Sequence, residues 1–340
     1  MSQTRILIVG AGAVGQAYAL GLQRAGVEVS FFVKPHHVER LKKGIPVQEV
    51  GLMSVGPLED LSDVALLTDW DAVAGQTFHS IWLAVDGTAL MGDWLEAMSK
   101  ARGTAAVVAF QTGVGGRERL RALVPEDALV VGMIPFLAWW APLDPTAEPP
   151  AFDPPDPPRM RIWHPPLMRT PLSGRAALVA ELVGLLRAGG LSAKAVDNAA
   201  ATGSMGTAAL LPTIAGLEVA GWSLKGFAGG PVPDLVVKAV TEARTVASAI
   251  TGTTARGPAM WLLRPTVLRL VVRLAPLFAP LDLQTYLKVH FTKVGVQTLH
   301  TLHGLLDEAG SRGLPAASLS SLARQLEAAR DSGGSADAEN

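Results

Sequence analysis

The chain of 340 residues contains no cysteine, which excludes disulfide bonds, thiolate metal ligands and a cysteine nucleophile. A chain without cysteine fits a reducing compartment, and we expect a cytoplasmic protein. Charge is also scarce, because Asp, Glu, Lys and Arg make up 17% of the residues and leave a formal net charge of -1. The composition therefore predicts neither a nucleic-acid partner nor electrostatic attachment to a membrane.

Long uninterrupted apolar runs are missing from the sequence, although its mean hydropathy of +0.30 is high. The first apolar run, residues 6–9, is too short for a signal peptide and predicts a strand. The most apolar stretch, residues 259–281, contains three arginines and three prolines, which argues against insertion across a membrane. We expect a core-facing helix there, with a helix that lies on a membrane surface as the alternative.

The N-terminal half alternates short β-branched runs with helical runs, the pattern of a doubly wound parallel α/β sheet. The expected strands are residues 5–10, 27–33, 79–85 and 104–110, with expected helices over 13–26 and 93–101.

The organisation changes in the second half of the chain. Residues 142–171 are rich in proline and predict an irregular excursion or an edge-strand region. A helix resumes near residue 173, strand signals nearly cease after about residue 197, and helical runs continue to Glu327. We therefore predict an α/β domain over 1–195, an all-α domain over 196–328 and a disordered tail over 329–340.

A glycine motif joins the first strand to the first helix. Gly10, Gly12 and Gly15 form G-x-G-x-x-G, with Ala13 and Val14 inside the motif. In a Rossmann-type domain these glycines permit the tight turn, the approach of the pyrophosphate and the packing of helix on strand, while the helix N-terminus donates to phosphate. We predict that these five residues bind a dinucleotide; a tight turn without a ligand is the alternative.

The end of the second strand indicates which dinucleotide is bound. An NAD site usually places a carboxylate there for the ribose hydroxyls. Here the strand ends in "FFVKPHH", so Lys34 takes that position and would attract a 2′-phosphate. Lys34 therefore favours NADP(H), although it could also be an ordinary solvated lysine at a strand end.

The arrangement resembles the ketopantoate reductase (2-dehydropantoate 2-reductase) family. The resemblance depends on "ILIVGAGAVG", "VKPHHVERLKKGIPV", "FQTGVGGRERL", "YLKVHFTKVGVQT" and "GSRGLPAASLSSL". It implies a Rossmann domain followed by an all-helical domain. In the loop that resembles the family's Q-N-G motif, Gln111 and Gly113 match and Thr112 replaces the asparagine; the resemblance implies that all three contact the cofactor.

Several residues that this family uses for chemistry are replaced. Asp86 takes the place of a family lysine, and Gly203 takes the place of the catalytic lysine that opens the helical domain. Thr207 and Leu211 take the places of two asparagines. Reduction of a ketone needs a donor where negative charge develops on oxygen, and neither Gly203 nor Leu211 has one. We therefore predict that ketopantoate is not the substrate.

The stretch "YLKVHFTKV" contains residues that could replace the missing acid. Tyr286, His290 and Lys293 are four and three residues apart and so share one helix face. Lys293 could donate to a carbonyl oxygen, and His290 could shuttle a proton near neutral pH. An ordinary polar helix face is the alternative. His300 and His303 share a face but lack a third ligand, so we expect no metal site.

Together these features predict an NADP(H)-dependent reductase of a small or medium apolar carbonyl, imine or enone. Thr207, Leu211 and Tyr286 are the expected substrate-pocket residues. The alternative is a redox-neutral enzyme, such as a cyclase or isomerase, or a ligand-sensing module on the same fold. We expect a small-molecule substrate, no integral membrane insertion, and a homodimer formed through the helical domain.

Overall fold

The computed structural model describes residues 3–61, 63–110, 114–143, 159–254 and 263–336. The predicted residues Gln111, Thr112 and Gly113 lie outside these ranges. The chain divides into two compact units, the first ending at Gly203 and the second beginning at Ser204. This division falls inside a helix, somewhat later than the boundary at 195 predicted from the sequence.

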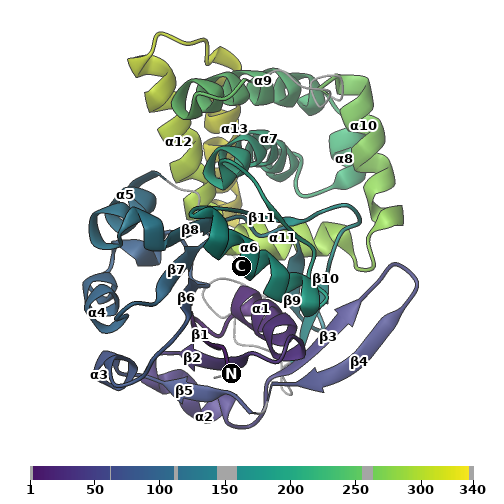
Figure 1. Cartoon of the computed structure of the whole chain (residues 1–340). Helices are drawn as coiled ribbons and strands as arrows, with labels where there is room; N and C mark the ends of the chain where they lie inside the picture. Colours follow the sequence, from purple (N-terminus) through teal and green to yellow (C-terminus); the bar gives the residue numbers. More distant parts are fainter. Residues whose placement is uncertain (1–2, 62, 111–113, 144–158, 255–262, 337–340) are drawn as a thin grey trace. The chain divides into compact units, whose positions relative to one another are not determined.

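An eight-stranded sheet forms the centre of the first unit (Figure 1), with the strand order β12-β11-β8-β7-β6-β1-β2-β5. Its strands are β1 (Arg5–Val9), β2 (Glu28–Phe32), β5 (Ala65–Leu67), β6 (Ser80–Leu83), β7 (Ala106–Ala109), β8 (Leu129–Gly132), β11 (Thr170–Ser173) and β12 (Ala193–Ala195). The six strands from β8 to β5 in this order are parallel, β11 is antiparallel to β8, and β12 is parallel to β11. The doubly wound sheet predicted from the sequence is therefore confirmed.

Alternate residues of the strands bury the two faces of this sheet. Ile6 and Ile8 belong to one buried cluster, and Leu7 and Val9 belong to the other. This alternation is what a strand covered by helices on both sides requires. The helices of the unit are α1 (Ala13–Arg24), α2 (Val38–Leu41), α3 (Trp70–Ala74), α4 (Trp94–Ala101), α5 (Val114–Leu123) and α6 (Ala176–Ala188).

A second, four-stranded sheet has the order β4-β3-β10-β9 and corrects one expectation. Its strands are β3 (Pro46–Val50), β4 (Val55–Asp60), β9 (Leu137–Trp140) and β10 (Met160–Trp163). The proline-rich region was expected to be irregular or to lie at a sheet edge, yet β10 lies between β3 and β9, and β11 lies between β8 and β12. Pro171 is tolerated in β11 because only Leu172 and Ser173 pair with β8.

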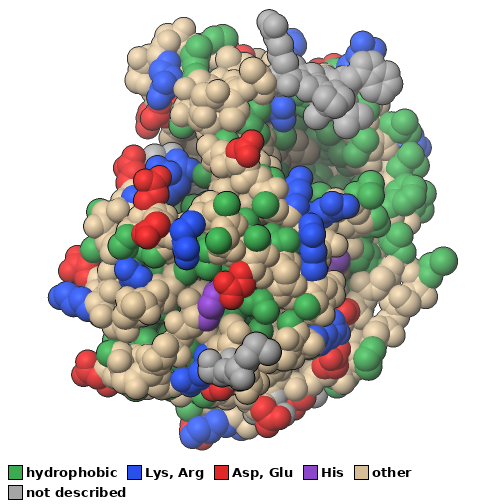
Figure 2. Space-filling view, in the orientation of Figure 1, with side chains coloured by type: hydrophobic (Ala, Val, Ile, Leu, Met, Phe, Trp, Pro, Cys, Tyr) green, Lys and Arg blue, Asp and Glu red, His purple; other side chains and the backbone are tan. Residues whose placement is uncertain are grey.

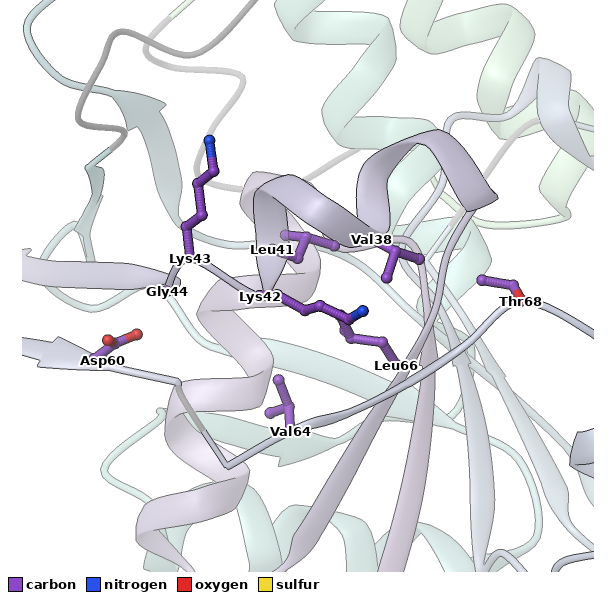
Figure 3. Close-up of a pocket in the computed structure, with 9 residues that line it drawn as sticks. All are labelled: Val38, Leu41, Lys42, Lys43, Gly44, Asp60, Val64, Leu66 and Thr68. Carbon is purple, nitrogen blue, oxygen red and sulfur yellow. The ribbon is translucent and has the colours of Figure 1, made fainter.

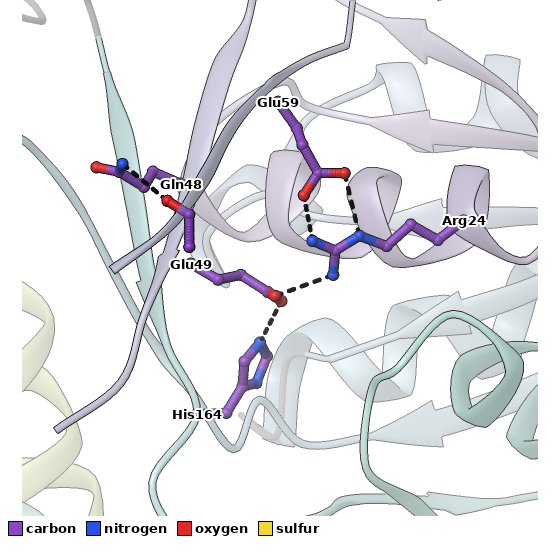
Figure 4. A network of polar contacts seen from close by, with 6 residues as sticks. Arg24, Gln48, Glu49, Glu59 and His164 are labelled. Carbon is purple, nitrogen blue, oxygen red and sulfur yellow. Dashed lines mark hydrogen bonds and ion pairs between the residues drawn. The ribbon is translucent and has the colours of Figure 1, made fainter. Parts of the chain in front are cut away.

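Ion pairs join helix α1 to the second sheet (Figure 4). The Arg24 guanidinium donates to Glu59, and its other terminal nitrogen lies 2.9 Å from Glu49 Oε2. His164 Nε2 lies 3.4 Å from Glu49 Oε1 on the other side of that carboxylate. His164 and Arg24 together lower the pKa of Glu49 to about 2, against its partial burial. The network therefore fixes the small sheet to the helix that follows the glycine motif.

The described residues of the second unit form helices joined by turns, without a strand. Its helices are the C-terminal part of α7 (Ala199–Val219), α8 (Leu224–Gly229), α9 (Val232–Thr251), α10 (Pro265–Leu274), α11 (Leu283–Lys293), α12 (Gly295–Ser311) and α13 (Ala317–Ala336), with a 3-10 turn, η5 (Ala275–Phe278). The all-helical C-terminal part predicted from the sequence is confirmed. Among the described residues, no helix combines the length and the apolar character needed to cross a bilayer.

Helix α13 continues to Ala336, past residue 329, where the sequence predicts the start of a disordered tail. Leu319, Leu322 and Leu326 of this helix are fully buried in the core of the second unit. Arg330 holds the helix beyond its buried leucines, because its guanidinium donates to both carboxylate oxygens of Glu218, at 2.7 and 2.8 Å. A bidentate pair of this kind fixes a helix end that small polar residues alone would leave frayed.

Candidate functional site

The loop between β1 and α1 has the geometry of a nucleotide-binding turn. Gly10 has φ +99, a left-handed conformation that L side chains rarely adopt. A Cβ at Gly10 would also lie 2.8 Å from the backbone oxygen of Ala84. The Gly10 N–H donates to Phe32 O at 2.9 Å, which fixes the start of the loop to the end of β2.

Gly12 and Gly15 need to be glycine for different reasons. A Cβ at Gly15 would lie 2.1 Å from Gly10 O, so the helix packs on its own loop only without a side chain. A Cβ at Gly12 would meet no atom within 4 Å. Gly12 therefore borders open space, where a ligand can approach the backbone.

The first turn of α1 offers unpaired donors towards a ligand. Gly12 is the N-cap residue, with no side-chain cap and no acid in the first turn. In the part of the chain that the structure describes, the N–H groups of Gly12, Ala13 and Val14 have no hydrogen-bond acceptor. Such donors together with the helix dipole favour an anion, and a carboxylate cap would compete with it. The geometry fits the pyrophosphate of a dinucleotide.

Sequence reasoning missed Gln16, which positions this loop. Its side chain is fully buried, and its Nε2 donates to Ala11 O at 2.8 Å. Its backbone N–H donates to Gly12 O at 3.0 Å. Both bonds turn loop carbonyls towards α1, which leaves the loop N–H groups facing outward. No residue pattern marks such a role, because a glutamine inside a helix is ordinarily solvent-facing.

Two charged residues follow the carboxyl ends of the strands beside β1. Lys34 lies two residues after β2, is exposed and precedes the 3-10 turn η1 (Pro35–His37). No carboxylate among the described residues forms an ion pair with it. Asp86 follows β6, and its Oδ1 accepts from the Thr88 hydroxyl at 2.5 Å and the Ala89 N–H at 2.9 Å. Asp86 thus caps a local turn, while Lys34 is available to a ligand.

A cavity of about 540 Å³ opens beside the sheet edge at β5 (Figure 3). Aliphatic side chains line it together with two lysines, an aspartate and a threonine: Val38, Leu41, Lys42, Lys43, Gly44, Asp60, Val64, Leu66 and Thr68. Lys42 is paired with Glu39 at 2.9 Å. None of residues 10–15 lines this cavity, so it is distinct from the place where the glycine loop presents its donors.

Helix α11 brings together the three polar residues that its spacing predicted. The rings of Tyr286 and His290 stack at 5.5 Å between centroids, and the His290 ring meets Phe291 edge to face at 4.9 Å. Burial raises the pKa of Tyr286 above its ordinary value. Desolvation by surrounding protein atoms is the larger cause and the Lys293 ammonium the smaller one, and together they lower the pKa of His290 to about 4. His290 remains exposed to solvent over part of its surface, and the lowered pKa leaves its ring neutral at pH 7.

Lys293, the other candidate acid, is the last residue of α11. Partial burial lowers the pKa of its ammonium. A lysine with a lowered pKa gives up its proton more readily than a solvated one, which suits a general acid. The shift also shows that Lys293 is not a fully solvated charge, although its side chain remains accessible.

The predicted pocket residues of α7 share one helix face. Gly203, Thr207 and Leu211 follow each other at intervals of four residues along a continuous helix. Gly203 is buried, Thr207 is half-buried, and Leu211 packs against the core of the second unit. Pro212 lies inside the helix and cannot donate to the carbonyl of Ala208. This face offers a hydroxyl at Thr207, but no ammonium or amide.

Comparison of the sequence with protein families gives one match. Residues 6–140 match the family "Ketopantoate reductase PanE/ApbA". These residues include the glycine loop, Lys34 and Asp86. No curated protein matches the chain.

Solved structures of similar fold extend along nearly the whole chain. A D-mandelate dehydrogenase solved with NADH and anilino(oxo)acetate is 14% identical, with TM-score 0.73 over 97% of this chain and 99% of its own. A 2-dehydropantoate 2-reductase from Geobacter metallireducens is 17% identical, with TM-score 0.68 over 96% and 99%. A dimeric ketopantoate reductase from Staphylococcus aureus is 14% identical, with TM-score 0.64 over 96% and 99%. At these identities the comparison shows a common fold.

Proposed function

We propose that the protein is an NADP(H)-dependent reductase, because residues 6–140, which include the glycine loop and Lys34, match the ketopantoate reductase family. Its substrate would be a small or medium apolar carbonyl, imine or enone other than ketopantoate. The family and its structural neighbours are oxidoreductases, which supports reductase chemistry in general.

The open cradle at Gly12 is the observation that carries this proposal. Gly12, Ala13 and Val14 have N–H groups without an acceptor among the described residues, and a Cβ at Gly12 would meet no atom within 4 Å. We assign the pyrophosphate to these donors, with Gly10 and Gly15 shaping the turn. Gln111, Thr112 and Gly113 would complete the cofactor contacts. A bound NADP(H) would supply the hydride, and the chain would supply the proton.

Lys34→Ala is expected to weaken NADPH binding and leave NADH binding nearly unchanged. Lys34 follows the strand whose end meets the adenosine ribose, and its ammonium would pair with the 2′-phosphate. Loss of a charged hydrogen bond of about 1.5–3 kcal/mol predicts a roughly ten- to hundredfold weaker affinity. Calorimetric titration with each cofactor measures both values, with Lys42→Ala as the matched control on the neighbouring turn. Equal losses for NADPH and NADH would contradict the choice of NADP(H).

Turnover of ketopantoate with NADPH is expected to be negligible. Gly203 and Leu211 offer no donor where the family has a lysine and an asparagine, and such donors contribute about 10²–10⁴-fold each. The measurement is NADPH oxidation with ketopantoate and with a panel of apolar ketones, imines and enones. Ketopantoate turnover in the ordinary enzymatic range of about 1–10³ s⁻¹ would contradict the substrate proposal.

A redox-neutral enzyme or a ligand sensor is the second candidate function. The face of α7 that carries Gly203, Thr207 and Leu211 lacks an ammonium group. A protein without that proton donor could bind the cofactor without reducing a substrate, which favours this second candidate. The NADPH oxidation assay distinguishes the two functions. A protein that binds NADPH but oxidises it with no member of the panel would support the second candidate.

The helical part would provide the substrate pocket and the acid. We assign residues 196–328 to this domain, with Thr207, Leu211 and Tyr286 contacting substrate, Lys293 protonating it and His290 as its neutral neighbour. We also propose a homodimer formed through this domain. The dimeric Staphylococcus aureus protein of similar fold supports a dimer, and the interface through the helical domain is our proposal.

A further inference from the structure

Helix α10 and the turn η5 carry an apolar surface that the proposed reductase function does not use. Five large apolar side chains are exposed within nine residues: Leu270 (56%), Val271 (51%), Leu274 (38%), Leu277 (73%) and Phe278 (61%). We call these five residues the α10 surface. Figure 2 shows hydrophobic side chains gathered along the edge where Figure 1 draws α10.

The α10 surface lies opposite the face with which the helix packs on its own unit. Leu268 and Val272 pack against the helical core. At 100° per residue, Leu270 and Leu274 point away from those two residues, and Val271 lies on the flank between the inner and the outer side. The helix is therefore apolar on its inner and its outer side. An outer apolar face of this extent on a water-exposed helix indicates a binding surface rather than a packing requirement.

The sequence segment that carries this surface has charged residues of a single sign. No aspartate or glutamate occurs in the sequence between Glu242 and Asp282, whereas five arginines do. Arg269 on α10 is held by Asp234 at 2.5 Å and by Gly230 O at 3.2 Å. Arg273, one turn further on, is exposed on the flank of the outer face. The segment is thus formally positive although the whole chain is nearly neutral, and Asp234 on α9 offsets the charge of Arg269 but not that of Arg273.

A second copy of the chain matches this surface poorly. Two α10 helices that met antiparallel across a twofold axis would bring their Arg269–Arg273 flanks against each other. Asp234 offsets the charge of Arg269, but no carboxylate of the segment offsets that of Arg273. An anionic lipid surface supplies the missing charge, because headgroup phosphates can meet the arginines while acyl chains receive the apolar side chains.

We propose that the α10 surface docks on a membrane that contains anionic lipids. Leu270, Val271, Leu274, Leu277 and Phe278 enter the boundary between headgroups and acyl chains, and Arg273 binds headgroup phosphate at its edge. The helix lies along the membrane plane, which agrees with the finding that no described helix could cross a bilayer. This docking is independent of cofactor binding, since α10 belongs to the second unit and the glycine loop to the first.

The test is flotation of the full chain with vesicles of phosphatidylcholine alone and with 30% phosphatidylglycerol. We expect the protein to float with the anionic vesicles and to lose that binding as salt is raised. Leu277→Glu combined with Phe278→Glu should reduce binding at least about tenfold. The change replaces two exposed apolar side chains by negative charges, which the anionic membrane repels. Arg273→Glu should reduce binding to the anionic vesicles only.

Met53→Glu is the matched control, because Met53 is fully exposed in the first unit and should bind vesicles like the wild type. NADPH affinity measures correct folding of each variant. Two outcomes would overturn the proposal. In the first, the wild type binds neither vesicle. In the second, light scattering shows a dimer that Leu277→Glu with Phe278→Glu dissociates, which would assign the α10 surface to a second copy.

Discussion

Gly12→Ala is expected to leave the protein as stable as the wild type and to abolish most of its affinity for NADPH. The added Cβ would meet no atom within 4 Å, so the apo protein has room for it. That room adjoins the start of α1, where we assign the pyrophosphate to the N–H groups of Gly12, Ala13 and Val14. Loss of two or more charged hydrogen bonds predicts a roughly hundredfold or greater decrease in affinity. Calorimetric titration and thermal unfolding measure the two quantities separately.

Gly15→Ala is the matched variant with the opposite expectation. Its Cβ would lie 2.1 Å from Gly10 O, and neither backbone can move without separating α1 from β1. Overpacking of this kind predicts a loss of about 3 kcal/mol in the free energy of unfolding. If Gly12→Ala bound NADPH normally, the cradle would not be the cofactor site. If Gly15→Ala were as stable as the wild type, the close packing of α1 on its loop would be wrong.

The part of the fold that the sequence predicted rests on local patterns. β1 and β6 are mainly apolar runs that are buried on both faces. The motif G-x-G-x-x-G lies between a strand and a helix. Each of these signals is contained in a few consecutive residues. The second sheet has no such signal. β3 pairs with β10 across more than a hundred residues of chain, and the exposed pattern of β4 resembles a loop. Pairing over that distance cannot be read from composition.

The candidate site was predictable to the same limited extent. The glycine loop and the shared face of Tyr286, His290 and Lys293 follow from spacing alone. The role of Gln16 does not, because it depends on the loop bending back over its own helix. The pKa of His290 was also beyond the sequence: an unperturbed histidine would shuttle protons near pH 7, and only its surroundings show that it stays neutral.

Lys293→Met is expected to reduce turnover at least about a hundredfold with any substrate found in the panel, while NADPH affinity and folding survive. Methionine keeps the length and volume of the side chain and removes the proton donor. Lys288→Met, on the same helix, is exposed and serves as the control that should leave turnover unchanged. His290→Ala should have a smaller effect than Lys293→Met, since a neutral ring can only relay a proton.

The pH profile of turnover distinguishes proton donation by Lys293 from stabilisation of negative charge by its positive charge alone. A general acid acts while protonated, so the rate should fall as pH rises through the lowered pKa of Lys293, at a pH below 10.5. Lys293→Arg keeps the positive charge but cannot give up its proton at these pH values, so it should retain substrate KM and lose kcat.

A measurement that needs no substrate tests the same residue. Because Lys293 is one cause of the depressed pKa of His290, Lys293→Met should raise that pKa from about 4 towards 6.5 without reaching it, since burial is the larger cause. NMR titration of the His290 ring gives the value directly. An unchanged His290 pKa in Lys293→Met would show that the ammonium points away from this face of α11. Wild-type turnover in the same variant would remove Lys293 from the chemistry altogether.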